Sequence, residues 1–274
     1  MRVSISHLNP YLALFRIRMI AGLQYRAAAW AGAATQFFWG FMLLSIYLAF
    51  YRSGGGEPPM PWPQLASYIW LQQAFLALFG LWWQDNELLS SITNGHVAYE
   101  LCRPCDLYAF WSTRLLAMRL SNVALRCLPI LTVTFFLPAT YRLSPPAGVA
   151  GLLLFLLSIT LAALLNVAVS MFVYILTFIT LSPVGSRLLI GVASEFMMGS
   201  IIPIPLMPVW IQRLLNFFPF RYISDLPLRL WSGNIYGREA LFQIMVQLAW
   251  LAGLCVLGHV CFRRVCKRVV VQGG

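Results

Sequence analysis

Long apolar stretches separated by short polar ones dominate the pattern of this chain. An apolar helix needs about 20 residues to cross the hydrocarbon of a bilayer, and several stretches reach that length. A transmembrane barrel would instead require short strands of alternating polarity. We therefore predict an all-α polytopic membrane protein, organised as one domain over residues 1–274. Its six expected transmembrane helices cover approximately 27–50, 64–83, 111–138, 147–181, 188–202 and 240–262.

The fourth stretch, 147–181, is longer than one bilayer crossing requires. We expect this helix to be tilted, to project beyond the membrane, or to be broken. Loops rich in glycine and proline separate the other stretches, most clearly at 53–63, between the first and second expected spans.

Composition and charge support a membrane protein over a nucleic-acid-binding one. The chain is 60% hydrophobic and 10% charged, whereas about a quarter of the residues in soluble domains are charged. The net charge of +11 could suit nucleic acid, but the basic residues lie at the ends of apolar stretches instead of forming one solvated patch. We therefore expect membrane lipids as partners and no nucleic acid.

The first 26 residues predict a helical element before the first expected span. Asn9 and Pro10 are typical of a helix start. Apolar residues then recur at helical spacing, at Leu12, Phe15, Met19 and Leu23. Two interpretations fit residues 1–26: an interfacial helix lying on the inner leaflet, or an extended foot of the first spanning helix.

The distribution of basic residues predicts the orientation of the chain. Six crossings place both termini on one side of the membrane. With cytoplasmic termini, the inner segments hold 13 of the 19 basic residues and the outer loops hold six. Because basic residues favour the cytoplasmic side, we expect both termini and the polar segment 85–108 in the cytoplasm.

The segment 85–108 is an unusually polar interruption, and we predict that it is a cytoplasmic docking element. It contains four of the eight acidic residues of the chain, Asp85, Glu87, Glu100 and Asp106. It also contains a CxxC pair, Cys102 and Cys105. A zinc site would need two further ligands, and only His96 is close in sequence. A thioredoxin-like redox site would need a βαβ pattern, which the sequence lacks. We therefore expect no metal and no cofactor.

Catalytic patterns are also missing from the sequence. No GxxxxGK[ST] phosphate-binding motif occurs, and the single lysine is Lys267. The three histidines and eight acidic residues form no hydrolase or metalloprotease pattern. We therefore expect that the chain is not an enzyme.

The segment 203–239 combines apolar character with breaks in helical structure. Pro203, Pro205 and Pro208 prevent a continuous helix. Irregular backbone at membrane depth is tolerated where protein buries it or where it lines a watery cavity. We predict that 210–218 is a short amphipathic helix dipping back into the membrane, and an ordinary interfacial aromatic belt remains the alternative.

The order of these parts resembles the permease subunit of an ABC-2-type exporter over essentially the whole chain. That resemblance implies an N-terminal interfacial helix, six spans, a cytoplasmic coupling helix between spans two and three, and re-entrant outer helices between spans five and six. It implies ATPase-coupling residues at Asn94, Gly95, Tyr99, Glu100, Leu101, Arg103, Pro104 and Asp106. It implies an outer gate at Pro203, Pro205, Pro208, Trp210, Pro219, Phe220 and Tyr222. The cysteines that flank Arg103-Pro104 depart from the family pattern.

The same resemblance implies a function and partners. The chain would export an amphipathic or lipid-like substrate, a drug or a natural product across the cytoplasmic (inner) membrane of a bacterium. Separate ABC ATPase subunits would supply the energy, and a second permease subunit, the same or different, would complete the membrane part. A passive channel and a membrane-embedded lipid-modifying enzyme are the alternatives.

Two ionisable residues are expected inside spans, where charge is costly and often functional. Glu195 lies eight residues beyond Arg187, or about 12 Å along a helix. Arg126 lies seven residues beyond Arg119 on the same face of the third span, about 10 Å deeper. Three hypotheses follow: an ion pair between Glu195 and Arg126, a Glu195 that faces the substrate path, or a Glu195 that reaches water.

Overall fold

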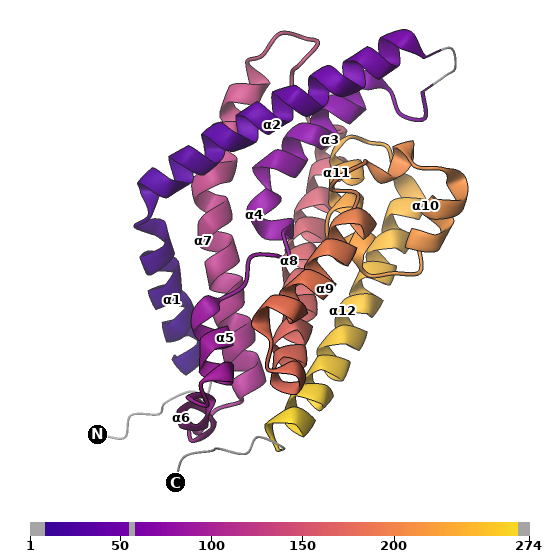
Figure 1. Ribbon diagram of the computed structural model, residues 1–274. Helices are drawn as coiled ribbons and strands as arrows, with labels where there is room; N and C mark the ends of the chain where they lie inside the picture. The colour runs from indigo at the N-terminus through magenta and orange to yellow at the C-terminus, as the bar shows by residue number, and fades with distance from the viewer. Residues whose placement is uncertain (1–8, 55–57, 268–274) are drawn as a thin grey trace.

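The computed structural model describes residues 9–54 and 58–267, and these residues form helices joined by turns and irregular segments, with no strand among them. Four helices are long and apolar enough to cross a membrane: α2 (Arg26–Ser53), α7 (Leu107–Phe135), α8 (Gly148–Thr180) and α12 (Gly237–Cys266). They correspond to the first, third, fourth and sixth expected spans (Figure 1). The prediction of an all-helical membrane protein is thereby confirmed.

The other two expected spans differ from the prediction. The stretch 64–83 consists of α3 (Trp62–Ala74), a short α4 (Leu76–Phe79) and an irregular segment, 80–84. The fifth is α9 (Pro183–Met197), which has 15 residues. It begins five residues earlier than predicted because the Ser182 side chain accepts a hydrogen bond from the Gly185 amide, which caps the first turn. The count of six spans is therefore not confirmed by helix length.

The fourth span is a single unbroken helix. α8 contains 33 residues, which corresponds to about 50 Å. It ends where Leu181 adopts a left-handed conformation, with φ of 53°. Of the three expectations for this stretch, a break is wrong.

α1 (Asn9–Leu23) is separate from α2, because the chain turns at residues 24–25. It packs against α7. The approach is close at Gly22, where a Cβ atom would lie 2.2 Å from the Ser121 Oγ. The predicted apolar face is only partly correct, since Leu12 is exposed whereas Leu14 is half-buried. A foot continuous with the first span is therefore wrong, and an interfacial position remains a prediction.

The helices bury two large aromatic centres. Trp70 of α3, a helix in the upper half of Figure 1, is fully buried and donates a hydrogen bond to the Tyr141 carbonyl at 2.6 Å. Trp111 of α7 stacks on Phe178 of α8 and meets Phe262 of α12 edge-on, with centroids 6.1 Å and 5.2 Å apart. Large buried aromatics contribute strongly to packing, so these centres fix the long helices relative to one another.

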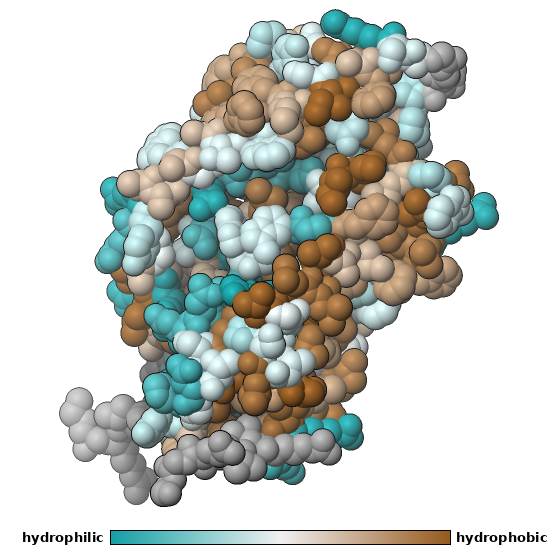
Figure 2. Space-filling view, viewed as in Figure 1, coloured by the Kyte–Doolittle hydropathy of each residue, from teal (hydrophilic) through white to brown (hydrophobic). Residues whose placement is uncertain are grey.

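Two segments of short helices occupy different parts of the bundle (Figure 1). α5 (Asn86–Thr93) and α6 (Val97–Leu101) lie at the lower end, with the first turn of α7 and the last turn of α12. The segment after α9 lies in the upper half and contains the turns η1 (Ile204–Leu206) and η2 (Phe220–Tyr222) and the helices α10 (Val209–Leu215) and α11 (Asp225–Trp231). In this view hydrophobic side chains gather over α9 and α10, and hydrophilic ones gather at the lower left over α5 and α6 (Figure 2).

Candidate functional site

Asp85 begins α5 and fastens it to the long helices. Its carboxylate accepts hydrogen bonds from the Glu87 and Leu88 amides, which satisfies the free N–H groups of the first turn. The same carboxylate accepts two bonds from Arg114 of α7, at 2.6 Å and 3.0 Å. The Asp85 amide donates to the Tyr174 hydroxyl of α8 at 2.9 Å. These polar contacts therefore fix α5 to α7 and α8.

Further polar contacts tie α5 to α1 and α9. The Glu87 carboxylate accepts from Arg114 and also from Arg18 of α1, the latter at 3.3 Å. Arg187 of α9 donates to the Asn86 Oδ1 at 3.0 Å. The charges of this network lie in the polar segment and at the ends of apolar stretches, and the sequence alone does not indicate which of them pair. The one sequence feature that points to this network is Asp85, an acidic residue at the start of α5.

Removing the charge of Glu87 is expected to have a small, pH-dependent effect. The charge and hydrogen bond of Arg114 lower the pKa of Glu87 below its ordinary value of 4.5. A carboxyl group whose pKa is lowered by folding contributes its full stabilisation at pH values above its ordinary pKa. That contribution is lost as the pH falls through the pKa of the folded state. Because the Glu87 side chain is 73% exposed, solvent screening limits it to about 0.5 kcal/mol.

The measurement is the thermal unfolding midpoint of the purified protein and its Glu87→Gln variant between pH 7 and pH 3. The variant should unfold slightly earlier at pH 7, and the difference should disappear towards pH 3. A difference that grows on acidification would contradict the assignment.

Five of the predicted coupling residues are exposed on α6 and the turns beside it, at the lower end of the bundle in Figure 1, and we call this set the coupling surface. It consists of Asn94, Tyr99, Leu101, Arg103 and Pro104, all exposed. Tyr99 is 79% exposed and Leu101 40% exposed, although both are large and apolar or aromatic. Gly95 makes the turn between α5 and α6 with φ of +74°, a conformation that favours glycine.

The other two predicted coupling residues, Glu100 and Asp106, bind within the chain. The Trp111 indole N–H donates to the Glu100 carboxylate at 2.5 Å. Asp106 caps α7 by accepting from the Ala109 amide at 2.8 Å, and its Oδ2 lies 3.6 Å from Arg263 of α12. These two acids therefore hold the segment in place, and the coupling surface depends on them indirectly.

The predicted outer-gate residues differ in their exposure. Pro203, Pro205, Pro219 and Tyr222 are buried, and Phe220 is half-buried. Pro208 and Trp210 are exposed, Trp210 by 68%. The short helix expected at 210–218 is present as α10 but covers Val209–Leu215.

A buried charge cluster lies beside these residues and was missed in the sequence. Asp225 of α11 is fully buried, and its Oδ1 accepts from the Tyr68 hydroxyl of α3 at 3.2 Å. Arg221 and Arg229 each place a guanidinium nitrogen 3.5 Å from its Oδ2. The i,i+4 spacing of the two arginines from Asp225 was the available signal.

A second missed residue, Arg119, supports the irregular backbone after α4. Arg119 of α7 is 1% exposed. Its guanidinium donates to the carbonyls of Leu78, Gly80 and Trp83 at 3.3 Å, 2.9 Å and 3.1 Å, and to the Ser170 hydroxyl at 2.8 Å. A broken helix inside a membrane needs such donors, because its free carbonyls cannot reach water.

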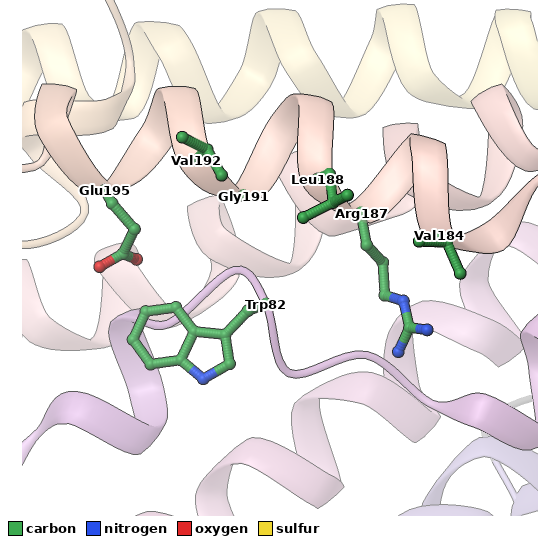
Figure 3. A pocket seen from close by; sticks show the side chains of 7 residues that line it. All are labelled: Trp82, Val184, Arg187, Leu188, Gly191, Val192 and Glu195. Carbon is green, nitrogen blue, oxygen red and sulfur yellow. The ribbon is translucent and has the colours of Figure 1, made fainter.

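The structure does not bring Glu195 and Arg126 together as an ion pair. The Arg126 guanidinium lies over the Trp83 ring, 4.7 Å from its centroid. Glu195 lines a pocket beside Trp82, and its Oε1 is buried without a hydrogen-bond partner in the described part of the chain (Figure 3). The ion-pair hypothesis is therefore wrong for this conformation.

The described residues contain no group of three or more histidine, cysteine or acidic side chains placed to hold a metal ion. Cys102 is exposed and Cys105 is partly buried, and both are free. Nothing in this arrangement gives the CxxC pair a chemical role.

Comparison with known families adds an independent finding. Residues 62–273, most of the chain, match the family described as ABC-2 family transporter protein. The match begins at α3 and includes α5, α6 and the whole segment from α9 to α12. Searches of curated proteins and of solved structures find no match.

Proposed function

Because this chain belongs to the ABC-2 transporter family, we propose that it is the membrane-spanning permease subunit of an ABC exporter. Its family and its several long apolar helices make it a multi-pass membrane transport protein. We propose in addition that a separate ATPase powers it and that it exports its cargo.

The observation that carries the proposal is the coupling surface. An exposed tyrosine and an exposed leucine stand at one end of the bundle, on short helices tied to α1, α7, α8 and α9. A partner that pushes on α5 and α6 would move these helices. A separate ABC ATPase subunit fits this role.

We further propose six crossings of the cytoplasmic membrane of a bacterium, with both termini in the cytoplasm. The path of the chain supports this number, because α3 and α4 lead down the bundle and α9 leads back up (Figure 1). The excess of basic residues in the segments assigned to the inside supports the orientation. A second permease subunit, the same or different, would complete the pathway for an amphipathic or lipid-like substrate, a drug or a natural product.

The test is a single substitution on the coupling surface. Tyr99→Ala should abolish co-purification of the partner ATPase, or reduce it about tenfold, because an exposed aromatic anchor at an interface is often worth more than 1 kcal/mol. The matched control is Tyr236→Ala, which removes an equally exposed tyrosine, 79% in both cases, at the start of α12. Unchanged ATPase binding by the Tyr99 variant, or equal loss in both variants, would contradict the proposal.

A further inference from the structure

A small pocket lies between α9 and the irregular segment 80–84. Its volume is about 310 Å³. Glu195 stands at one end with its carboxylate directed toward the ring of Trp82, and Arg187 stands at the other end (Figure 3). Between them the wall is apolar, formed by Leu188, Gly191 and Val192. The pocket thus combines one acidic group and one aromatic face with an apolar wall.

The Glu195 carboxylate has an unused bonding capacity. Its Oε1 is buried and has no hydrogen-bond partner within residues 9–54 and 58–267. Burying a carboxylate oxygen without a partner is costly, so we expect a water, an ion or a ligand to complete its bonding. A ligand that supplies positive charge would remove this cost.

The backbone around Trp82 is fixed in position beside the Glu195 carboxylate. Arg119 binds the carbonyls on both sides of it, those of Gly80 and Trp83. Gly80 leaves room for the indole, since a Cβ atom there would lie 2.9 Å from the ring. The ring of the neighbouring Trp83 is in contact with the guanidinium of Arg126. No cation lies over Trp82 in the described part of the chain, and its side chain is 37% exposed.

We propose that this pocket binds an organic cation with an apolar body, with the cationic centre between the Glu195 carboxylate and the Trp82 ring. Aromatic faces attract cations, and the attraction strengthens where water is excluded. The apolar wall would hold the body of the ligand. Arg187, about 12 Å from Glu195 along α9, repels positive charge from the opposite end and so fixes the direction of binding.

This inference rests on the proposed function, because it names the class of cargo. The pocket opens on the exposed apolar side of α9, where Leu188 is 59% exposed and Val192 is 67% exposed. An amphipathic cation could therefore enter from the membrane or from a cavity between subunits.

The experiment measures equilibrium binding of tetraphenylphosphonium to the purified full-length chain in nanodiscs. Glu195→Gln is expected to weaken binding about tenfold, because it removes the charge but keeps the shape. Trp82→Ala should weaken it similarly, and Trp82→Phe less, since phenylalanine keeps an aromatic face. The matched control is Glu239→Gln, which removes the same charge from an exposed position at the start of α12 and should leave affinity unchanged.

A second probe separates charge recognition from simple apolar binding. Tetraphenylborate has the same shape and the opposite charge, and Glu195→Gln should not weaken its binding. Equal affinity of the wild type and Glu195→Gln for tetraphenylphosphonium would overturn the proposal. The proposal would also be overturned if Trp82→Ala weakened the binding of both probes equally while Glu195→Gln weakened neither. It would be overturned as well if Glu195→Gln lowered subunit association but left probe binding unchanged. Co-purification of the ATPase with Glu195→Gln is measured separately, so failure here leaves the coupling role intact.

Discussion

Replacing Arg119 with methionine is expected to destabilise the protein by about 3–5 kcal/mol, because three buried carbonyls would lose a donor and each unsatisfied buried group costs about 1–3 kcal/mol. Methionine fills a similar volume but donates no hydrogen bond. The carbonyls of Leu78, Gly80 and Trp83 would lose a donor at a depth where water does not replace it. The expected result is a clearly lower temperature at which the detergent-purified protein loses its monodisperse chromatographic peak.

Arg126→Met is the matched control for that substitution. Arg126 lies on the same helix, seven residues further on, and contacts the Trp83 ring while remaining half-buried. Its loss should cost about 1 kcal/mol, the usual scale of a cation–π contact. Arg119→Lys should recover only part of the loss, because an ammonium group lacks the planar fork that reaches several acceptors. Equal stability of the two methionine variants would show that the carbonyl contacts of Arg119 contribute no more to stability than the ring contact of Arg126.

Arg119 also shows why one span could not be predicted correctly. The apolar pattern of 64–83 is long enough for a continuous helix, and nothing local requires a break at residues 75–84. The break persists because side chains from α7 and α8 satisfy the freed carbonyls. Asn166 of α8, for example, donates to the Phe79 carbonyl at 2.6 Å. These contacts join residues 36 to 87 positions apart, so a pattern confined to neighbouring residues does not contain them.

The long helices were predictable for the opposite reason. The apolar stretches that became α2, α7, α8 and α12 satisfy their own backbone hydrogen bonds, so length and composition were sufficient. Their boundaries were also close, because proline and glycine mark the connections. α9 is the exception, since its start depends on the cap made by Ser182.

The polar segment could be located from the sequence, but the direction of its side chains could not. The polar segment 85–108 was located from its charges, and the exposed positions of Tyr99 and Leu101 agree with a surface that contacts a partner. Glu100 also resembles a surface acid in sequence. It points inward because α6 brings it against Trp111, eleven residues later and in the next helix. Only the packing of α6 on α7 decides that.

Replacing Asp225 with asparagine is expected to cost about 3 kcal/mol or more, because two arginines would keep their charge near a site that lost its own. Asp225 is fully buried, and the Arg221 side chain is only 5% exposed. Asparagine keeps the shape, so the loss would report on charge alone. The measurement is again the midpoint of thermal unfolding, with Glu239→Gln as the exposed control, for which almost no change is expected.

A double-mutant cycle with Tyr68→Phe then tests whether the cluster acts as a unit. Tyr68 donates to Asp225 from α3 and is itself fully buried. If the hydrogen bond transmits the stability of α11 to α3, the double variant should lose less than the sum of the single losses, by about 1 kcal/mol. Strict additivity would show that the two residues act independently. α11 would then be held beside α3 by apolar packing and not by its buried charge.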